Sequence, residues 1–141
     1  MSDAAHPAPY RARISFWALM FGCCAAPIFW LGQVMLAYWI TAAACYGSDR
    51  PTVTHAPGLL TGMLIALDVI AIAAALAGAF VAWRGWRITK DEAGGGRAQA
   101  LHTGEGRTRF LALWGLFSSL CFAIAIVFNV IASLTVPLCT L

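Results

Sequence analysis

The chain has 141 residues, of which 61% are hydrophobic and 11% are charged, and its formal net charge is +3. A soluble domain of this length could not cover so much apolar surface with so few charged side chains. The composition therefore excludes an ordinary soluble protein. The basic residues flank long apolar runs, so we attribute the positive charge to contact with a membrane and expect no nucleic-acid partner.

Three apolar runs, at residues 16–44, 59–83 and 110–136, are each long enough to cross a bilayer, which takes ~20 residues of α-helix. Residues 88–108 are rich in glycine and charge, a composition that predicts a flexible loop with no core of its own. We therefore predict an all-α integral membrane protein with three transmembrane helices. Residues 1–141 would form a single membrane domain.

The basic residues are distributed unevenly between the two ends of the predicted helices. Arg50 alone falls in the loop between the first and second runs. The others precede the first run or lie around the loop between the second and third: Arg11, Arg13, Arg84, Arg87, Lys90, Arg97, Arg107 and Arg109. Because cytoplasmic loops carry an excess of Lys and Arg, this predicts a cytoplasmic N-terminus, a cytoplasmic loop 88–108 and a periplasmic C-terminus.

The first run contains Pro27, which removes one backbone hydrogen bond and predicts a kink about one turn earlier in the helix. The run ends near Cys45 and is nearly twice as long as the apolar region of a signal peptide, which has ~7–15 residues. We therefore treat it as a retained transmembrane helix.

The second run carries Asp68, which is the one Asp, Glu, Lys, Arg or His residue within the three runs. Steps of three and four residues from it reach only small side chains, at Ala71, Ala75, Gly78 and Ala82. Small residues at this spacing let transmembrane backbones approach closely. The pattern predicts that Asp68 faces a contact between helices, where a costly polar group belongs.

The other two runs each offer one amide at a similar depth, Gln33 in the first and Asn129 in the third. From the predicted outer ends of the helices, Gln33, Asp68 and Asn129 lie ~18, ~14 and ~12 Å deep. The same stepping from Asn129 predicts an inward face on the third helix made of Ala125, Phe122 and Ser118.

Three interpretations of this intramembrane polar cluster follow from the residue types. In the first, Gln33, Asp68 and Asn129 hydrogen-bond to one another and fix the packing, with burial keeping Asp68 protonated; such contacts contribute ~0.6–2 kcal/mol each. In the second, Asp68 contacts a partner subunit. In the third it belongs to a proton or cation relay, which usually needs several titratable groups in series.

Two of the five cysteines, Cys45 and Cys139, are predicted at the outer surface. In an oxidising compartment they are a candidate disulfide, with free thiols or metal binding as the alternatives. Cys23, Cys24 and Cys121 fall within the apolar runs and are interpreted as packing residues.

The sequence offers no complete catalytic or metal-binding motif. His6, His55 and His102 all lie outside the apolar runs, whereas a haem held between membrane helices needs axial histidines within them. We therefore predict no catalytic residue, no cofactor bound by this chain alone, and no enzymatic activity by itself.

Residues of the first and third runs carry a resemblance to a known family: Pro27, Trp30, Gln33, Cys45, Arg109, Phe110, Gly115, Ser118, Pro137 and Cys139. On these residues the chain resembles small bacterial three-span inner-membrane proteins that accompany haem–copper terminal oxidases of the cytochrome c oxidase type. The resemblance implies a multi-pass protein of the bacterial inner membrane. It also implies a non-catalytic accessory or assembly subunit of a respiratory complex, with haem and copper in the partner.

Two other functions stay open at this point. One is a small oligomeric transporter or channel with Asp68 lining its pore, which would need more polar residues along the Asp68 face than the alanines present. The other is an oxidase assembly factor that handles copper through its cysteines, which would need more exposed thiols than Cys45 and Cys139 provide.

Overall fold

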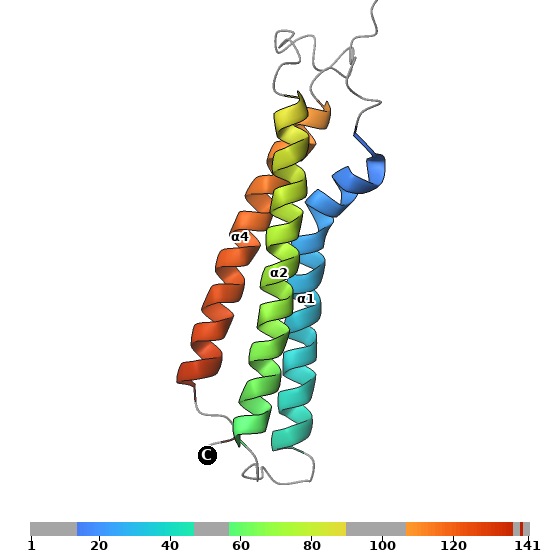
Figure 1. Ribbon diagram of the computed structural model, residues 1–141. Helices are drawn as coiled ribbons and strands as arrows, with labels where there is room; N and C mark the ends of the chain where they lie inside the picture. Colours follow the sequence, from blue (N-terminus) through green and yellow to red (C-terminus); the bar gives the residue numbers. More distant parts are fainter. Residues whose placement is uncertain (1–13, 47–56, 90–106, 137–138, 140–141) are drawn as a thin grey trace, which may run out of the picture.

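The computed structural model describes residues 14–46, 57–89, 107–136 and 139. Within these residues it contains three α-helices, α1 (Phe16–Cys45), α2 (Pro57–Thr89) and α4 (Arg107–Thr135). The helices run side by side in alternating directions, so α1 begins and α4 ends at opposite ends of the bundle (Figure 1). All three are long and apolar enough to cross a membrane, which confirms the prediction of an all-α protein with three such helices.

The second helix is longer than its apolar run predicted. The run was placed at residues 59–83, but α2 continues to Thr89, and its 33 residues measure ~50 Å. Hydropathy falls at Arg84, yet no proline follows to stop the backbone, and the Thr89 hydroxyl donates a hydrogen bond to the Gly85 carbonyl at 3.0 Å. The predicted loop 88–108 is therefore shorter at both ends, and its remainder lies outside the described residues.

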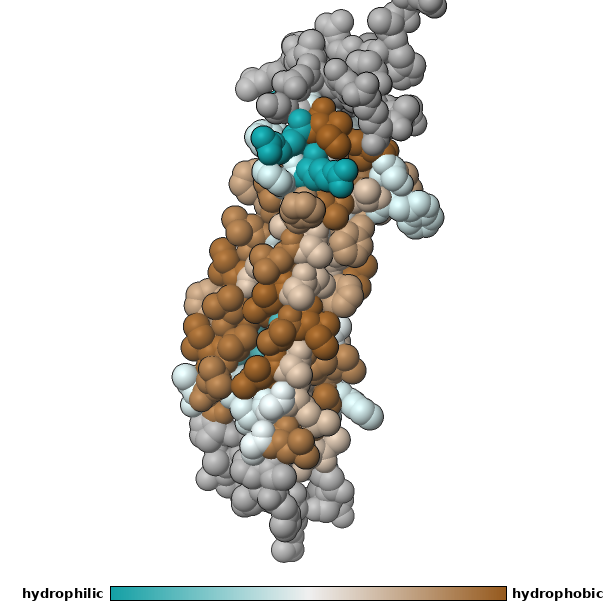
Figure 2. Space-filling model, in the orientation of Figure 1, coloured by the Kyte–Doolittle hydropathy of each residue, from teal (hydrophilic) through white to brown (hydrophobic). Residues whose placement is uncertain are grey.

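The outside of the bundle is largely apolar. Figure 2 shows hydrophobic side chains over most of its length and hydrophilic ones where α2 ends and α4 begins. Large exposed side chains come from every helix, among them Ile28, Leu36, Val69, Phe117 and Phe128. Exposing an apolar surface of this size to water would cost free energy, whereas lipid tails solvate it well. The surface is that of a multi-pass membrane protein in contact with lipid.

The interior is built from small residues. Asp68, Ala71, Ala75, Gly78 and Ala82 of α2 are all buried, which confirms the face predicted from their spacing. The centre of the core consists of Ala26, Ala71, Ala75 and Ile126. The rings of Trp30 and Phe122 pack against this core, and their centroids are 5.2 Å from each other. Close backbone contact, rather than large interlocking side chains, holds the bundle together.

The three helices are in close contact at Gly22 of α1, Ala82 of α2 and Gly115 of α4. A Cβ added at Gly115 would lie 2.8 Å from the Gly22 carbonyl oxygen, and one added at Gly22 would lie 3.3 Å from the Ala82 Cβ. The Ser119 hydroxyl donates to the same Gly22 carbonyl at 3.5 Å. Glycine is therefore required sterically at position 115, whereas a Cβ at position 22 would make a tight contact.

The predicted inward face of α4 is wrong by about one residue. The fully buried positions are Ala112, Gly115, Ser119 and Ile126, whereas Ser118 and Ala125 are only half-buried. The cause is the starting point of the count. Asn129 is itself half-buried, so it lies at the edge of the buried face, and stepping from an edge displaces the whole stripe.

The first helix bends as Pro27 predicted. Figure 1 shows its first turns leaning away from α2 before the helix runs alongside its neighbours. Pro27 lies inside α1, where it lacks an N–H group and its ring crowds the carbonyl of Cys23. The turns that precede the close contact at Gly22 therefore lie apart from α2, whereas the rest of α1 runs alongside it.

Candidate functional site

The structure brings together the three polar side chains that the sequence singled out, one from each helix. Gln33 Nε2 donates a hydrogen bond to Asp68 Oδ1 at 2.5 Å. Asn129 Nδ2 donates to Gln33 Oε1 at 3.4 Å. Gln33 therefore bridges the other two, and the chain of hydrogen bonds crosses from α2 through α1 to α4.

Helix packing places this polar cluster in the interior. Asp68 is 1% exposed and Gln33 is 6% exposed, whereas Asn129 is half-buried at the edge of α4. The alanine face of α2 lets α1 approach closely enough for the Gln33 amide to reach the carboxyl group. The contact between Gln33 and Asp68 thus depends on the small residues of α2.

One oxygen atom of the cluster takes no part in these hydrogen bonds. Asp68 Oδ2 is buried and has no hydrogen-bond partner within the described part of the chain. Amides do not titrate, so Asp68 is the one group of the cluster that can exchange a proton. A relay would need a second titratable group in contact with it, and within the described residues the hydrogen bonds of Asp68 lead to Gln33 and Asn129.

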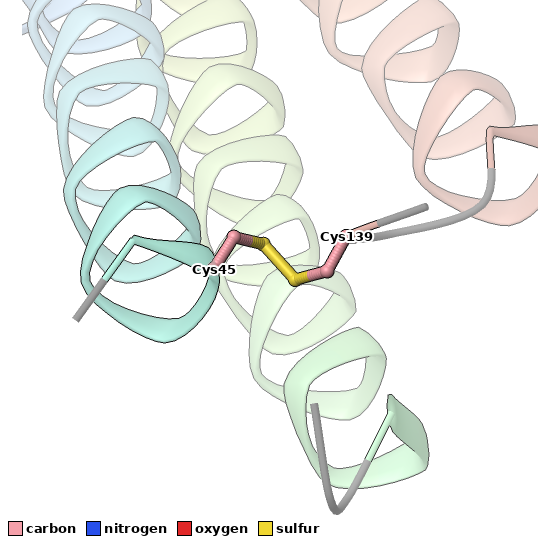
Figure 3. Close-up of a disulfide and its surroundings, with 2 residues drawn as sticks. All are labelled: Cys45 and Cys139. Atoms are coloured by element: carbon pink, nitrogen blue, oxygen red, sulfur yellow. A yellow bond between two sulfur atoms is a disulfide. The ribbon is translucent and has the colours of Figure 1, made fainter. Parts of the chain in front are cut away.

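The end of the bundle at which α1 finishes carries a disulfide between Cys45 and Cys139, shown in Figure 3. The two Cα atoms are 5.3 Å apart, within the usual range for this bond. The bond ties the end of α1 to the segment that follows α4, across 94 residues of sequence. It occupies both thiols at this end, so neither is free to bind copper while the bond exists.

The remaining cysteines belong to no metal-binding group among the described residues. Cys23 and Cys24 are half-buried in α1, and Cys121 is exposed on α4. Among residues 14–46, 57–89, 107–136 and 139, no group of three His, Cys, Asp or Glu side chains could hold a metal ion. The three histidines all lie outside these residues, so the expectation of no bound cofactor stays a prediction.

Sequence reasoning missed the residues that set how closely the helices approach. Gly22 was not singled out, and Gly115 entered only through the family resemblance. A signal was available, because a glycine within a run of large apolar residues is typical of a transmembrane contact. Spacing alone did not show that Gly22 and Gly115 contact each other, since they belong to different helices.

The geometry therefore describes a hydrogen-bonded polar cluster inside the bundle and a disulfide at one end of it. Comparisons of the chain with protein-family models, with characterised proteins and with solved structures find no match.

Proposed function

We propose that this chain is a non-catalytic accessory or assembly subunit of a respiratory membrane complex. The expected partner is a haem–copper terminal oxidase of the cytochrome c oxidase type, in which the partner holds the haem and copper. The choice of partner is supported by the resemblance carried by residues such as Pro27, Gln33 and Gly115. The role of a non-catalytic subunit is supported by the structure of the bundle itself.

The observation that carries the proposal is the separation of polar and apolar groups. The polar side chains of the membrane interior, Gln33, Asp68 and Asn129, are joined to one another across the helices. The large apolar side chains point outward from all three helices. A bundle of this kind offers a partner a surface for packing, while its polar groups stabilise its own fold.

We further propose that the N-terminus is cytoplasmic, the C-terminus is periplasmic and the membrane is the bacterial inner membrane. Two features support this orientation independently. The end at which α2 finishes and α4 begins carries Arg84, Arg87 and Arg109. The disulfide lies at the opposite end, where an oxidising compartment would form it.

The proposal is tested by purifying the tagged full-length chain from native membranes in a mild detergent. We expect oxidase subunits in the mass spectrum of the eluate and haem absorption in its visible spectrum. Deleting the gene should lower oxygen consumption by the membranes, and a plasmid copy should restore it. A chain that elutes alone from membranes whose respiration is unaffected by the deletion would contradict the proposal.

A second candidate, a small oligomeric transporter or channel, is favoured by Asp68 Oδ2, which has no hydrogen-bond partner among the described residues. It predicts proton or cation flux into liposomes that contain the purified chain alone. The flux should disappear in Asp68→Asn. The accessory-subunit proposal expects no such flux from the wild-type chain.

A further inference from the structure

A hollow near the basic end of the bundle has no part in the function proposed above. It measures about 330 Å³ and lies where the first turns of α1 lean away from α2 (Figure 1). Ala18 and Leu19 of α1, Val81 and Arg84 of α2, and Leu111 of α4 are among its lining residues. The wall is therefore mostly apolar and carries one cation.

A second hollow continues the first along the bundle. It measures about 620 Å³, shares Ala18 and Val81 with the first, and reaches Phe29 of α1. From Ser15 to Phe29 the helix rises ~21 Å, which is more than half of the ~30 Å hydrocarbon thickness of a bilayer. Together the two hollows make an apolar path from the level of Arg84 toward the middle of the membrane.

The positive charge at the mouth of this path lacks a nearby counter-charge within the described residues. Asp68, the one acidic residue among them, lies ~24 Å away along α2. Arg87 places its guanidinium over the Trp83 ring, 4.9 Å from the centroid, and does not line the hollow. Arg84 is thus the cation that faces an occupant of the hollow.

We propose that this hollow binds an anionic phospholipid of the surrounding membrane, with its phosphate on Arg84 and an acyl chain along the apolar path. Basic pockets between transmembrane helices suit such headgroups, because the cation lies at the depth of the phosphate. The Ser15 hydroxyl also lines the hollow and makes no capping bond to its own helix, so it can donate to a phosphate oxygen. A zwitterionic lipid binds less tightly, because its own positively charged group offsets the charge of its phosphate.

Lipid binding here follows from the Pro27 bend and does not depend on the identity of a protein partner. The bend leaves a gap between the first turns of α1 and the end of α2, and the acyl chain fills it. The bound lipid then supports the first turns of α1 on the side where the described residues leave the hollow.

The test is native mass spectrometry of the full-length chain in detergent micelles with equimolar dioleoyl phosphatidylglycerol and dioleoyl phosphatidylcholine. The wild-type chain is expected to retain phosphatidylglycerol in preference. Arg84→Gln should lower that retention about fivefold, the factor that corresponds to ~1 kcal/mol per basic residue at ~1.4 kcal/mol per tenfold. Equal retention of the two lipids by the wild-type chain would overturn the proposal.

Two further variants separate a defined site from general attraction to positive charge. Arg87→Gln removes the same charge from a residue outside the hollow and should keep the preference. Ala18→Phe leaves every charge in place but fills the path, so it should lower retention. An equal loss in Arg84→Gln and Arg87→Gln, or full retention in an intact Ala18→Phe chain, would refute the site. Helical circular dichroism and an intact disulfide identify the folded variants.

Discussion

Asp68 is the residue at which helix packing and proton chemistry can be separated by substitution. Asparagine matches the size of aspartate and keeps an oxygen that can accept from Gln33 Nε2. We expect Asp68→Asn to change the unfolding free energy by less than ~1 kcal/mol, the scale of one interhelical polar contact. Asp68→Leu removes the contact and crowds a side-chain position that is 1% exposed, so it should destabilise the bundle by ~1–3 kcal/mol.

Denaturant titration of both Asp68 variants in detergent micelles gives these free energies, and oxygen consumption by the membranes gives the activity of the partner complex. Packing alone predicts that Asp68→Asn assembles and respires like the wild type. Intact assembly with lost respiration in Asp68→Asn would instead assign Asp68 to a relay, because asparagine cannot exchange a proton.

Gly115 offers a second test at the level of single residues. Its added Cβ would lie 2.8 Å from the Gly22 carbonyl oxygen, which is backbone and cannot rotate away. We expect Gly115→Ala to separate α4 from α1 and to cost ~1–3 kcal/mol of unfolding free energy. The same titration measures the cost.

Gly32→Ala is the matched control for Gly115→Ala, because nothing lies within 4 Å of a Cβ added at Gly32. It should leave the bundle as stable as the wild type, or more stable, since alanine is the better helix former. Equal stability of the two variants would show that α1 and α4 do not meet as closely as described.

At the scale of helices, the Cys45–Cys139 bond is tested by counting thiols. We expect denatured, unreduced protein from native membranes to react at three cysteines, the ones that are free in the structure: Cys23, Cys24 and Cys121. Reduction should raise the count to five. Five reactive thiols before reduction would show that the bond does not form in the cell. If the bond forms as expected, Cys45→Ser and Cys139→Ser should each expose one additional thiol, with a loss of stability of ~2–4 kcal/mol.

How well each helix could be predicted depended on where its polar residue lies. Asp68 is at the centre of the buried face of α2, so counting from it found the whole face. Asn129 is at the edge of α4, so the same count displaced the predicted face. The end of α2 was misplaced because hydropathy reports where lipid ends, whereas the backbone stays helical through Arg84 to Thr89. The contact at Gly22 joins residues far apart in sequence, which a periodic pattern within one helix does not encode.

At the scale of the whole molecule, orientation in the membrane is the property that the other proposals share. A reporter active only in the periplasm, fused after Leu141, is expected to be active, because the arginines of the α2–α4 end favour the cytoplasm. The same reporter placed in the loop between α2 and α4 is the control and should be inactive. The opposite result would invert the topology and would remove the oxidising environment from the cysteine pair.

The bond between Cys45 and Cys139 also imposes an order on synthesis, membrane insertion and oxidation. The two cysteines are 94 residues apart, so at ~5–20 residues per second Cys45 is synthesised between ~5 and ~20 s before its partner exists. During that interval its thiol is available to any oxidant or competing thiol. Closure then needs α4 to have crossed the membrane in the right direction, since an inverted α4 would leave the two sulfur atoms on opposite sides. Formation of this one bond therefore requires that α4 has been inserted in the correct direction.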